Sequence, residues 1–268
     1  MGKTPYVAKR FSKSKSAKKT DTKKTKKPKT SNELVTKSML YKVLNKTIET
    51  KFASVQYTYT TFNSAISNIA DFLAILPAVQ AGTGQNQRIG NSIHPVKLEI
   101  RGYITVDSNT LWITAQEILC RLMCFQQKDL RSFADLASGN FNLLNVGGGS
   151  GQYDGSLLRQ CMPHNNDAYT FYKDLKHTFF KPYGLLNSSI TPVSSMNSSL
   201  VLPFHIVLTP KHMPSVFKYD SNVTGANYPD NFCPFLALGY CFGNNQTPDV
   251  TNTQLGMSYV STLYYKDA

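Results

Sequence analysis

Apolar and polar residues alternate with a period of two along most of the chain beyond residue 50. The clearest run lies between Val96 and Thr105, where Leu98, Ile100 and Ile104 alternate with charged or polar residues. Successive side chains of a β-strand point to opposite faces, so this pattern predicts a strand with one buried face. Similar runs predict further strands around Val55–Tyr59 and at about 113–125, 168–181, 199–209, 234–242 and 255–266.

A helical period replaces this alternation in two short segments. Thr30–Glu33 has the form of a capping box, and apolar residues recur behind it near helical spacing over 32–48. We interpret this part of the joining segment 31–50 as a short amphipathic helix, and a partly ordered linker is the alternative. The second segment predicts a helix of one or two turns that Pro77 ends, with apolar residues at Ile69, Phe72, Leu73 and Leu76.

The order of these elements predicts an all-β fold for residues 51–268. Long loops rich in Gly, Asn, Ser and Pro, such as 139–166 and 210–232, separate the strands, with hardly any helix between them. Parallel strands would need crossover helices, which the pattern does not provide. We therefore expect one domain, a single antiparallel jelly roll of about eight strands. Cys120 and Cys124 are expected on one strand face in its core.

The charge of the chain is concentrated at its N-terminal end. The sequence has 29 Lys and Arg against 16 Asp and Glu, and residues 1–50 alone hold 15 basic and 3 acidic residues. The remaining 14 basic and 13 acidic residues leave the body nearly neutral. We therefore expect a polyanionic partner for the N-terminal segment and not for the body. Nucleic acid is the first candidate, and an anionic membrane surface is the second.

Residues 1–30, called the arm below, consist mainly of Lys, Ser and Thr. A segment with so few apolar side chains cannot offset the entropy of ordering, so we expect the free arm to be disordered. Clusters such as Lys23–Lys29 also resemble a bipartite nuclear-localisation signal, which would engage a nuclear import receptor. The candidate nucleic-acid-binding residues are Lys3, Lys9, Arg10, Lys13, Lys15, Lys18, Lys19, Lys23, Lys24, Lys26, Lys27 and Lys29.

The cysteine and hydropathy patterns argue against a secreted or membrane-spanning protein. The five cysteines are odd in number and form no CxxC, and Met1–Arg10 lacks the apolar stretch of a signal peptide. Free thiols in a reducing compartment are therefore expected. No apolar run approaches the about 18 residues of a membrane-spanning helix.

No motif in the sequence predicts catalysis or a cofactor. The five histidines lie in unrelated contexts, without a nucleophile-elbow, zinc-protease or paired-carboxylate signature. Cys161 and His164 could form half of a metal site, but no second ligand pair at suitable spacing accompanies them. Gly147–Gly151 lacks a following strand-to-helix turn and a Lys partner, so we interpret it as a surface loop and not as a phosphate cradle.

One stretch of the body resembles a known family. Gly82–Asn91 is a Gly-rich loop that contains Arg-Ile-Gly, and it leads into Val96–Gly102, of the form apolar-x-Leu-x-apolar-Arg-Gly. Together with Cys120–Met123 and Tyr169–Asp174, these residues resemble the capsid proteins of small, circular, Rep-encoding single-stranded DNA viruses, the circovirus-like viruses. The resemblance covers residues 75–181 and, in kind only, the basic arm.

The resemblance implies a capsid-type jelly roll that assembles with itself, in about 60 copies, into a small icosahedral shell. The arm would lie inside on a single-stranded genome, DNA more than RNA. The protein would be part of the virion, and would occupy the host nucleus or cytoplasm during assembly, where a host import receptor is a further partner. Lys replaces the Arg that is usual in such arms, and no terminal strand matches a specific motif.

The resemblance also singles out Arg88, Gly90 and Arg101 as structural residues. Gly90 would supply a turn with positive φ into the strand that follows. Arg88 would pair with a carboxylate or with a neighbouring subunit, or it would close its own loop through a salt bridge.

Other functions fit part of the sequence. A coat protein of a satellite-like RNA virus would share the fold and the arm. A cellular nucleic-acid-binding β-sandwich would explain the arm, but such proteins normally carry Arg and stacking aromatics on the folded domain too. A secreted lectin-like or cytokine-like jelly roll would explain the body and leave the lysine-rich arm without a purpose.

Overall fold

The alternating segments form antiparallel strands. The computed structural model describes residues 49–106, 117–130, 133, 141–180, 201–220, 227–244 and 255–267. The arm and the segment 32–48 lie outside these residues. The elements are β1 (Lys51–Phe62), η1 (Ile69–Asp71), β2 (Leu73–Ala74), β3 (Ser92–Val106), β4 (Glu117–Gln127), β5 (Leu144–Asn145), β6 (Ser150–Gly151), η3 (Leu157–Gln160), β7 (Tyr169–Phe180), β8 (Val201–Leu208), β9 (Phe217–Lys218), β10 (Pro234–Phe242) and β11 (Leu255–Asp267).

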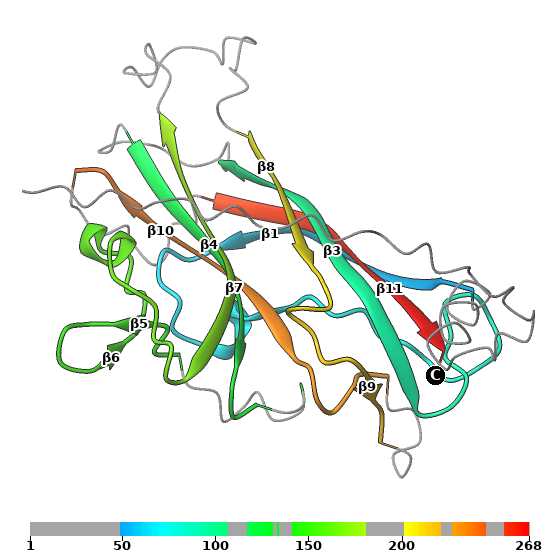
Figure 1. Cartoon of the computed structure of the whole chain (residues 1–268). Helices are drawn as coiled ribbons and strands as arrows, with labels where there is room; N and C mark the ends of the chain where they lie inside the picture. The colour runs from blue at the N-terminus through cyan, green and yellow to red at the C-terminus, as the bar shows by residue number, and fades with distance from the viewer. Residues whose placement is uncertain are drawn as a thin grey trace, which may run out of the picture. The chain divides into compact units, whose positions relative to one another are not determined.

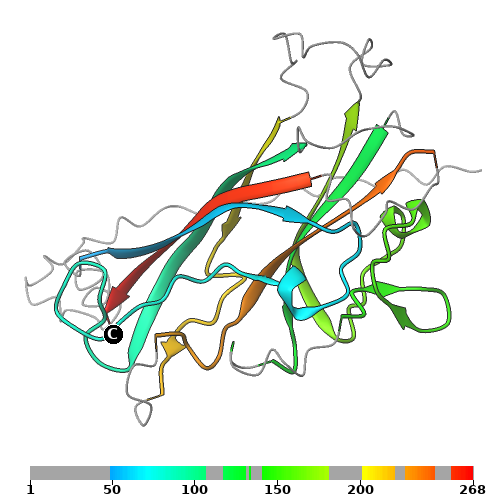
Figure 2. The ribbon, with the colours of Figure 1, turned by 180° about the vertical axis from the view of Figure 1, so that it is seen from behind.

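The long strands form two sheets. Sheet I contains β1, β11, β3 and β8 in this order, and the short β9 pairs with the start of β3. Sheet II contains β2, β10, β4 and β7. Figures 1 and 2 show the two sheets from opposite sides, with β1 and β11 adjacent along sheet I.

The strand order is that of a jelly roll. Numbered 1 to 8 along the chain, the eight main strands β1, β2, β3, β4, β7, β8, β10 and β11 are ordered 1-8-3-6 in sheet I and 2-7-4-5 in sheet II. The chain therefore passes back and forth between the sheets, and all pairs between named strands are antiparallel. Two nested Greek keys of this kind define the jelly roll, which confirms the predicted fold class.

The main core lies between the two sheets. Sheet I contributes fully buried side chains such as Ile100 and Leu263, and sheet II contributes Leu122 and Leu238. Cys120 and Cys124 point into this core, as predicted. Burial raises the pKa of the Cys120 thiol to about 12, so this cysteine is held in its neutral, unreactive form.

Sheet II has a second apolar layer on its outer face. Residues 141–168, called the cover segment below, include β5, β6 and η3 and lie beside this sheet (Figure 1). Leu143 and Tyr153 of the cover segment join a cluster with Phe125 of β4 and Phe235 of β10. Both faces of β10 are therefore buried, which explains why this strand has a continuous apolar sequence and little alternation.

A buried arginine fixes the cover segment to sheet II. Arg121, on β4, is almost completely buried and donates from Nη1 to the backbone carbonyls of Arg159, at 2.8 Å, and Met162, at 3.1 Å. Its Nε and Nη2 donate to the carboxylate of Asp174 on β7. His164 Nε2 lies 2.9 Å from the same carboxylate. The cover segment is thus held by polar groups as well as by apolar packing.

Two local predictions were wrong. The segment 69–76 is not a helix of one or two turns, because η1 has three residues and β2 follows almost at once. Asn68 and Asp71 form a capping box around η1, but pairing of Leu73 with Leu236 on β10 extends the chain. β3 begins at Ser92, earlier than predicted, since a register shift accommodates Pro95 opposite β11.

Candidate nucleic-acid interface

The outer face of sheet I is open to solvent over much of its area. Along β3, Leu98, Ile100 and Ile104 point into the core, so the alternating residues Arg101 and Tyr103 point outward. Tyr103 is 56% exposed. No cover segment comparable to that of sheet II packs on this face among the described residues.

Apolar side chains are exposed on all four long strands of this face. β8 and β11 contribute valines, and β1 contributes an aromatic ring at its start. Phe52 pairs in register with Tyr264 of β11, and the Nζ atom of Lys97 lies 4.3 Å from the centre of the Tyr264 ring. The exposed members on the four strands are Phe52, Tyr59, Val96, Tyr103, Val201, Val207 and Val260.

Three basic side chains surround one carboxylate at the centre of this face. Glu99 accepts from Arg101 Nη2 at 2.6 Å and from Lys97 Nζ at 3.1 Å. His205 Nε2, on the neighbouring strand β8, lies 2.7 Å from Glu99 Oε1. We call Lys97, Glu99, Arg101 and His205 the Glu99 cluster.

The Glu99 cluster exposes its basic side chains and shields its carboxylate. The side chain of Glu99 is 8% exposed, whereas that of Arg101 is 69% exposed and that of His205 is 51% exposed. Hydrogen bonds from Lys97 and Arg101 outweigh the opposing effect of burial, and with His205 they lower the pKa of Glu99 to about 2. The carboxylate is therefore ionised at neutral pH and neutralises only part of the surrounding positive charge.

The structure accounts for Arg88 and Gly90 by contacts within the chain itself. Gly90 has φ +86°, the positive value that the sequence led us to expect. Arg88 is buried, donates from Nε to the Val79 carbonyl at 3.3 Å and from Nη1 to the Gly90 carbonyl, and lies 4.2 Å over the ring of Tyr219. These contacts close the loop that precedes β3.

The same loop is fixed to the two ends of the described body. Lys51, the first residue of β1, forms an ion pair of 2.7 Å with Asp267 and donates to the Gln87 carbonyl. Asp267 Oδ1 also accepts from the backbone N–H of Ile89. Arg88 and Gly90 therefore lie in a structural junction, while Arg101 lies apart from them on the exposed face of β3.

The predicted nucleic-acid-binding residues of the arm lie outside the described residues. The chain nevertheless shows where the arm is connected to the body, because residue 49 leads directly into β1. β1 is an edge strand of sheet I. The arm is therefore joined to the body at the sheet that carries the Glu99 cluster.

Glu99 and His205 were not singled out from the sequence. The two residues are 106 positions apart, and only the pairing of β3 with β8 brings them together. The sequence did contain one indication of this cluster, because Lys97, Glu99 and Arg101 alternate with apolar residues and therefore share the polar face of the predicted strand.

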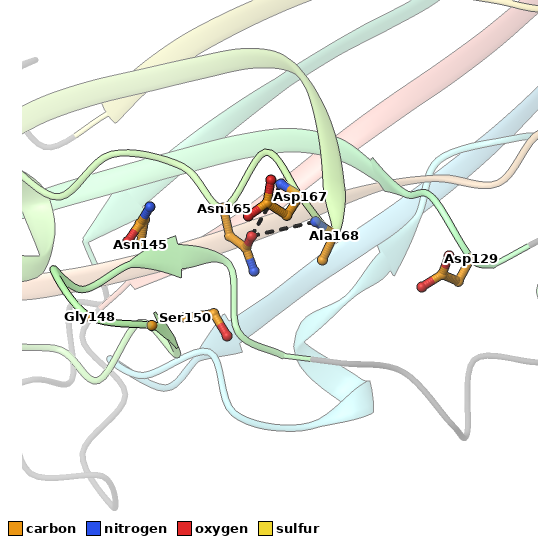
Figure 3. Close-up of a pocket in the computed structure, with 8 residues that line it drawn as sticks. Asp129, Asn145, Gly148, Ser150, Asn165, Asp167 and Ala168 are labelled. Carbon is orange, nitrogen blue, oxygen red and sulfur yellow. Dashed lines mark hydrogen bonds between the residues drawn. The ribbon is translucent and has the colours of Figure 1, made fainter.

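A pocket next to the β5–β6 turn has a different character (Figure 3). It has a volume of about 620 Å³, and its charged lining side chains are the carboxylates of Asp129 and Asp167. Asn165 uses its side-chain oxygen to accept from the backbone N–H groups of Asp167 and Ala168. A pocket with this charge disfavours phosphate, so the Gly147–Gly151 segment gains no support as a phosphate cradle.

His164, which the sequence offered with Cys161 as half of a metal site, packs against neighbouring side chains. His164 stacks on Phe171, with ring centres 3.9 Å apart, and contacts Asp174. Within the described ranges, no group of three or more His, Cys, Asp or Glu side chains is arranged to hold a metal ion. No helix in the same ranges is long and apolar enough to cross a membrane.

The chain matches no protein-family model and no curated protein. Its function is therefore inferred from three features: the jelly-roll body, the basic arm and the exposed face of sheet I.

Proposed function

We propose that this protein is a viral capsid protein that assembles with itself into a small closed shell and packages a single-stranded genome. The observation that carries the proposal is the combination of a nearly neutral jelly-roll domain with an N-terminal segment that has 15 basic and 3 acidic residues. The jelly roll supplies a rigid building block. The arm supplies the positive charge that phosphates require.

The proposal assigns a separate task to each part. The body forms the shell, in about 60 copies if the shell has the simplest icosahedral symmetry. The arm, with its 12 basic residues between Lys3 and Lys29, neutralises the genome inside. We propose DNA as the genome, on the resemblance of the Gly82–Asn91 and Val96–Gly102 segments to circovirus-like capsid proteins.

The arm would also direct the protein during assembly. Its lysine clusters are suited to a nuclear import receptor, so the same residues would serve first in import and then in packaging. The protein would then be found in the host nucleus or cytoplasm before it enters the virion.

Particle formation tests the proposal directly. We expect the purified full-length protein to give uniform spherical particles by negative-stain electron microscopy and a species of megadalton order by light scattering. Nucleic acid extracted from the particles should be sensitive to a single-strand nuclease. A strict monomer at every salt concentration and pH would contradict the proposal.

The nature of the packaged strand separates the two viral alternatives. Extracted nucleic acid that is degraded by deoxyribonuclease and resists ribonuclease supports the DNA genome. The opposite result in particles produced during infection supports a satellite-like RNA virus with the same fold. A cellular nucleic-acid-binding protein would bind single strands without forming any closed particle.

A further inference from the structure

We propose that the outer face of sheet I is itself a binding surface for single-stranded nucleic acid. Phosphates contact Arg101, Lys97 and His205, and a base stacks on Tyr103. In this scheme Glu99 forms ion pairs with Lys97 and Arg101 and so competes with phosphate for their donors. The inference rests on the proposed function for the identity of the partner, but it assigns a second, weaker contact to the body.

The charges on this face favour a polyanion. At the outward-facing positions of β3 and β8, one carboxylate, Glu99, stands against Lys97, Arg101 and two histidines, His94 and His205. The near-neutrality of the body as a whole therefore does not describe this surface. Glu99 is shielded behind Arg101 and His205, so an approaching strand meets the exposed basic side chains first.

Arg101 keeps free donors for a phosphate. Its Nε and Nη2 both donate to Oε1 of Glu99, at 3.1 and 2.6 Å. Arginine has five N–H donors, so its Nη1 group and the second hydrogen on Nη2 remain available. These donors have no protein partner among the described residues. Glu99 thus holds the guanidinium on the exposed face and occupies two of its five donors.

Exposed rings next to these cations favour single strands over other polyanions. Tyr103 lies two residues from Arg101 on the same face of β3, and its in-register neighbour on β8 is Pro203. Phe52 and Tyr264 lie on the other side of Lys97. Unpaired bases stack on such rings, whereas a duplex keeps its bases stacked inside.

The place in the chain at which the arm is attached adds an independent argument. The arm joins the body through β1, the edge strand of sheet I. A strand that is bound by the arm is therefore held at high effective concentration near the base of the arm, where even a weak contact becomes populated. In an assembled shell, this weak contact would hold the genome strand against the body of each subunit.

Full-length variants test the inference against a random single-stranded DNA oligonucleotide. Arg101→Gln should lower the affinity about tenfold, because charge-assisted hydrogen bonds are lost. It should also reduce the slope of log affinity against log salt by about 0.7. Tyr103→Ala should lower the affinity about tenfold with no change in slope, because stacking is uncharged.

Glu99→Gln is expected to increase the affinity for the oligonucleotide, and this increase can be measured even though the arm also binds. Removal of the competing carboxylate should raise the affinity several-fold and make the salt slope steeper. Lys211→Gln is the matched control, since Lys211 is an exposed lysine in the turn after β8, outside both sheets. This variant should change neither the affinity nor the slope. Circular dichroism verifies that each variant is folded.

Two outcomes would overturn the inference while the proposed function stands. If Arg101→Gln, Tyr103→Ala and Glu99→Gln all behave as Lys211→Gln, the face does not contact the strand. If Arg101→Gln and Tyr103→Ala prevent particle formation but leave oligonucleotide binding unchanged, the face contacts a second copy of the chain instead. Failure of the wild-type protein both to form particles and to bind the oligonucleotide would contradict the proposed function itself.

Discussion

Arg121 on β4 donates from Nε and Nη2 to the carboxylate of Asp174 on β7, with donor–acceptor distances between 2.8 and 3.2 Å. The same guanidinium donates to two carbonyls of the cover segment. A single buried side chain therefore links the sheet to the layer that covers it. A hydrophobic replacement would leave both the carboxylate and the carbonyls without these donors.

Arg121→Met is expected to lower the free energy of unfolding by about 3 kcal/mol, the usual cost of removing one member of a buried pair. Urea denaturation measures the change. Asp154→Asn is the matched control, because the Asp154–Arg159 pair is more exposed and should contribute less than about 1 kcal/mol. Equal effects of the two variants would contradict the role given to Arg121.

The stability of the body should fall in acid. Burial opposes ionisation of Asp174, but hydrogen bonds from His164 and Arg121 outweigh it and lower the pKa of Asp174 to about 2. The folded-state pKa thus lies below the ordinary value of 3.8, so this stabilisation is complete above that pH and is lost as the pH falls toward 2. The loss should be on the order of 2 kcal/mol.

Urea denaturation between pH 2 and pH 7 would measure this dependence. Asp174→Asn should be less stable at neutral pH and should show a shallower decline in acid, because the titrating group is gone. An unchanged pH profile in this variant would show that other carboxylates control the acid transition.

Deletion of residues 1–30 should abolish tight binding to single-stranded nucleic acid and leave the jelly roll folded. If half of the 12 basic residues of the arm engage phosphates, log affinity should fall with log salt at a slope of about −4 in the full-length protein. The truncated protein should retain only weak binding with a slope near −1.

Circular dichroism and a salt titration with a random oligonucleotide provide the measurements. A full-length variant with these 12 residues changed to Gln separates the effect of charge from that of length. A folded, truncated protein that keeps most of the affinity would contradict the assignment of the arm.

Gly102→Ala should destabilise the body by about 2 kcal/mol, because the added methyl group has no space. A Cβ atom at this position would lie 2.4 Å from the backbone oxygen of Ser258 and 2.7 Å from Cζ of Phe204. Gly148→Ala, where no atom lies within 4 Å of the added Cβ, is the control and should change stability by less than about 0.5 kcal/mol. Thermal unfolding of both variants would test the prediction.

The sequence was sufficient for the strands of sheet I because these strands bury one face and therefore alternate. β3 shows this best, since Leu98 and Ile100 enter the core while Arg101 stays in solvent. The segment 69–76 misled us, because apolar spacing over so few residues suits both a helical turn and an extended chain. Pairing of Leu73 with β10, far away in the sequence, decided between them.

The layer on sheet II and the Glu99 cluster could not be predicted, for a related reason. The cover segment has no regular period, and its contacts depend on groups such as Arg121 that come from a distant strand. The basic arm could be identified from the sequence, because charge composition is a local property that does not depend on contacts with distant residues. His205 became part of a site only through the register between β3 and β8.

The unequal covering of the two sheets implies an unequal resistance to hydrogen exchange. β4 is paired along most of its length on both edges, with β10 and β7, and apolar or polar layers cover both of its faces. Its amide protons should exchange with deuterium only through global unfolding. β8, which is an edge strand with one face open, should exchange through local opening many times faster. Amide exchange should therefore be slow in sheet II and faster at the β8 edge of sheet I, the sheet that carries the exposed Arg101.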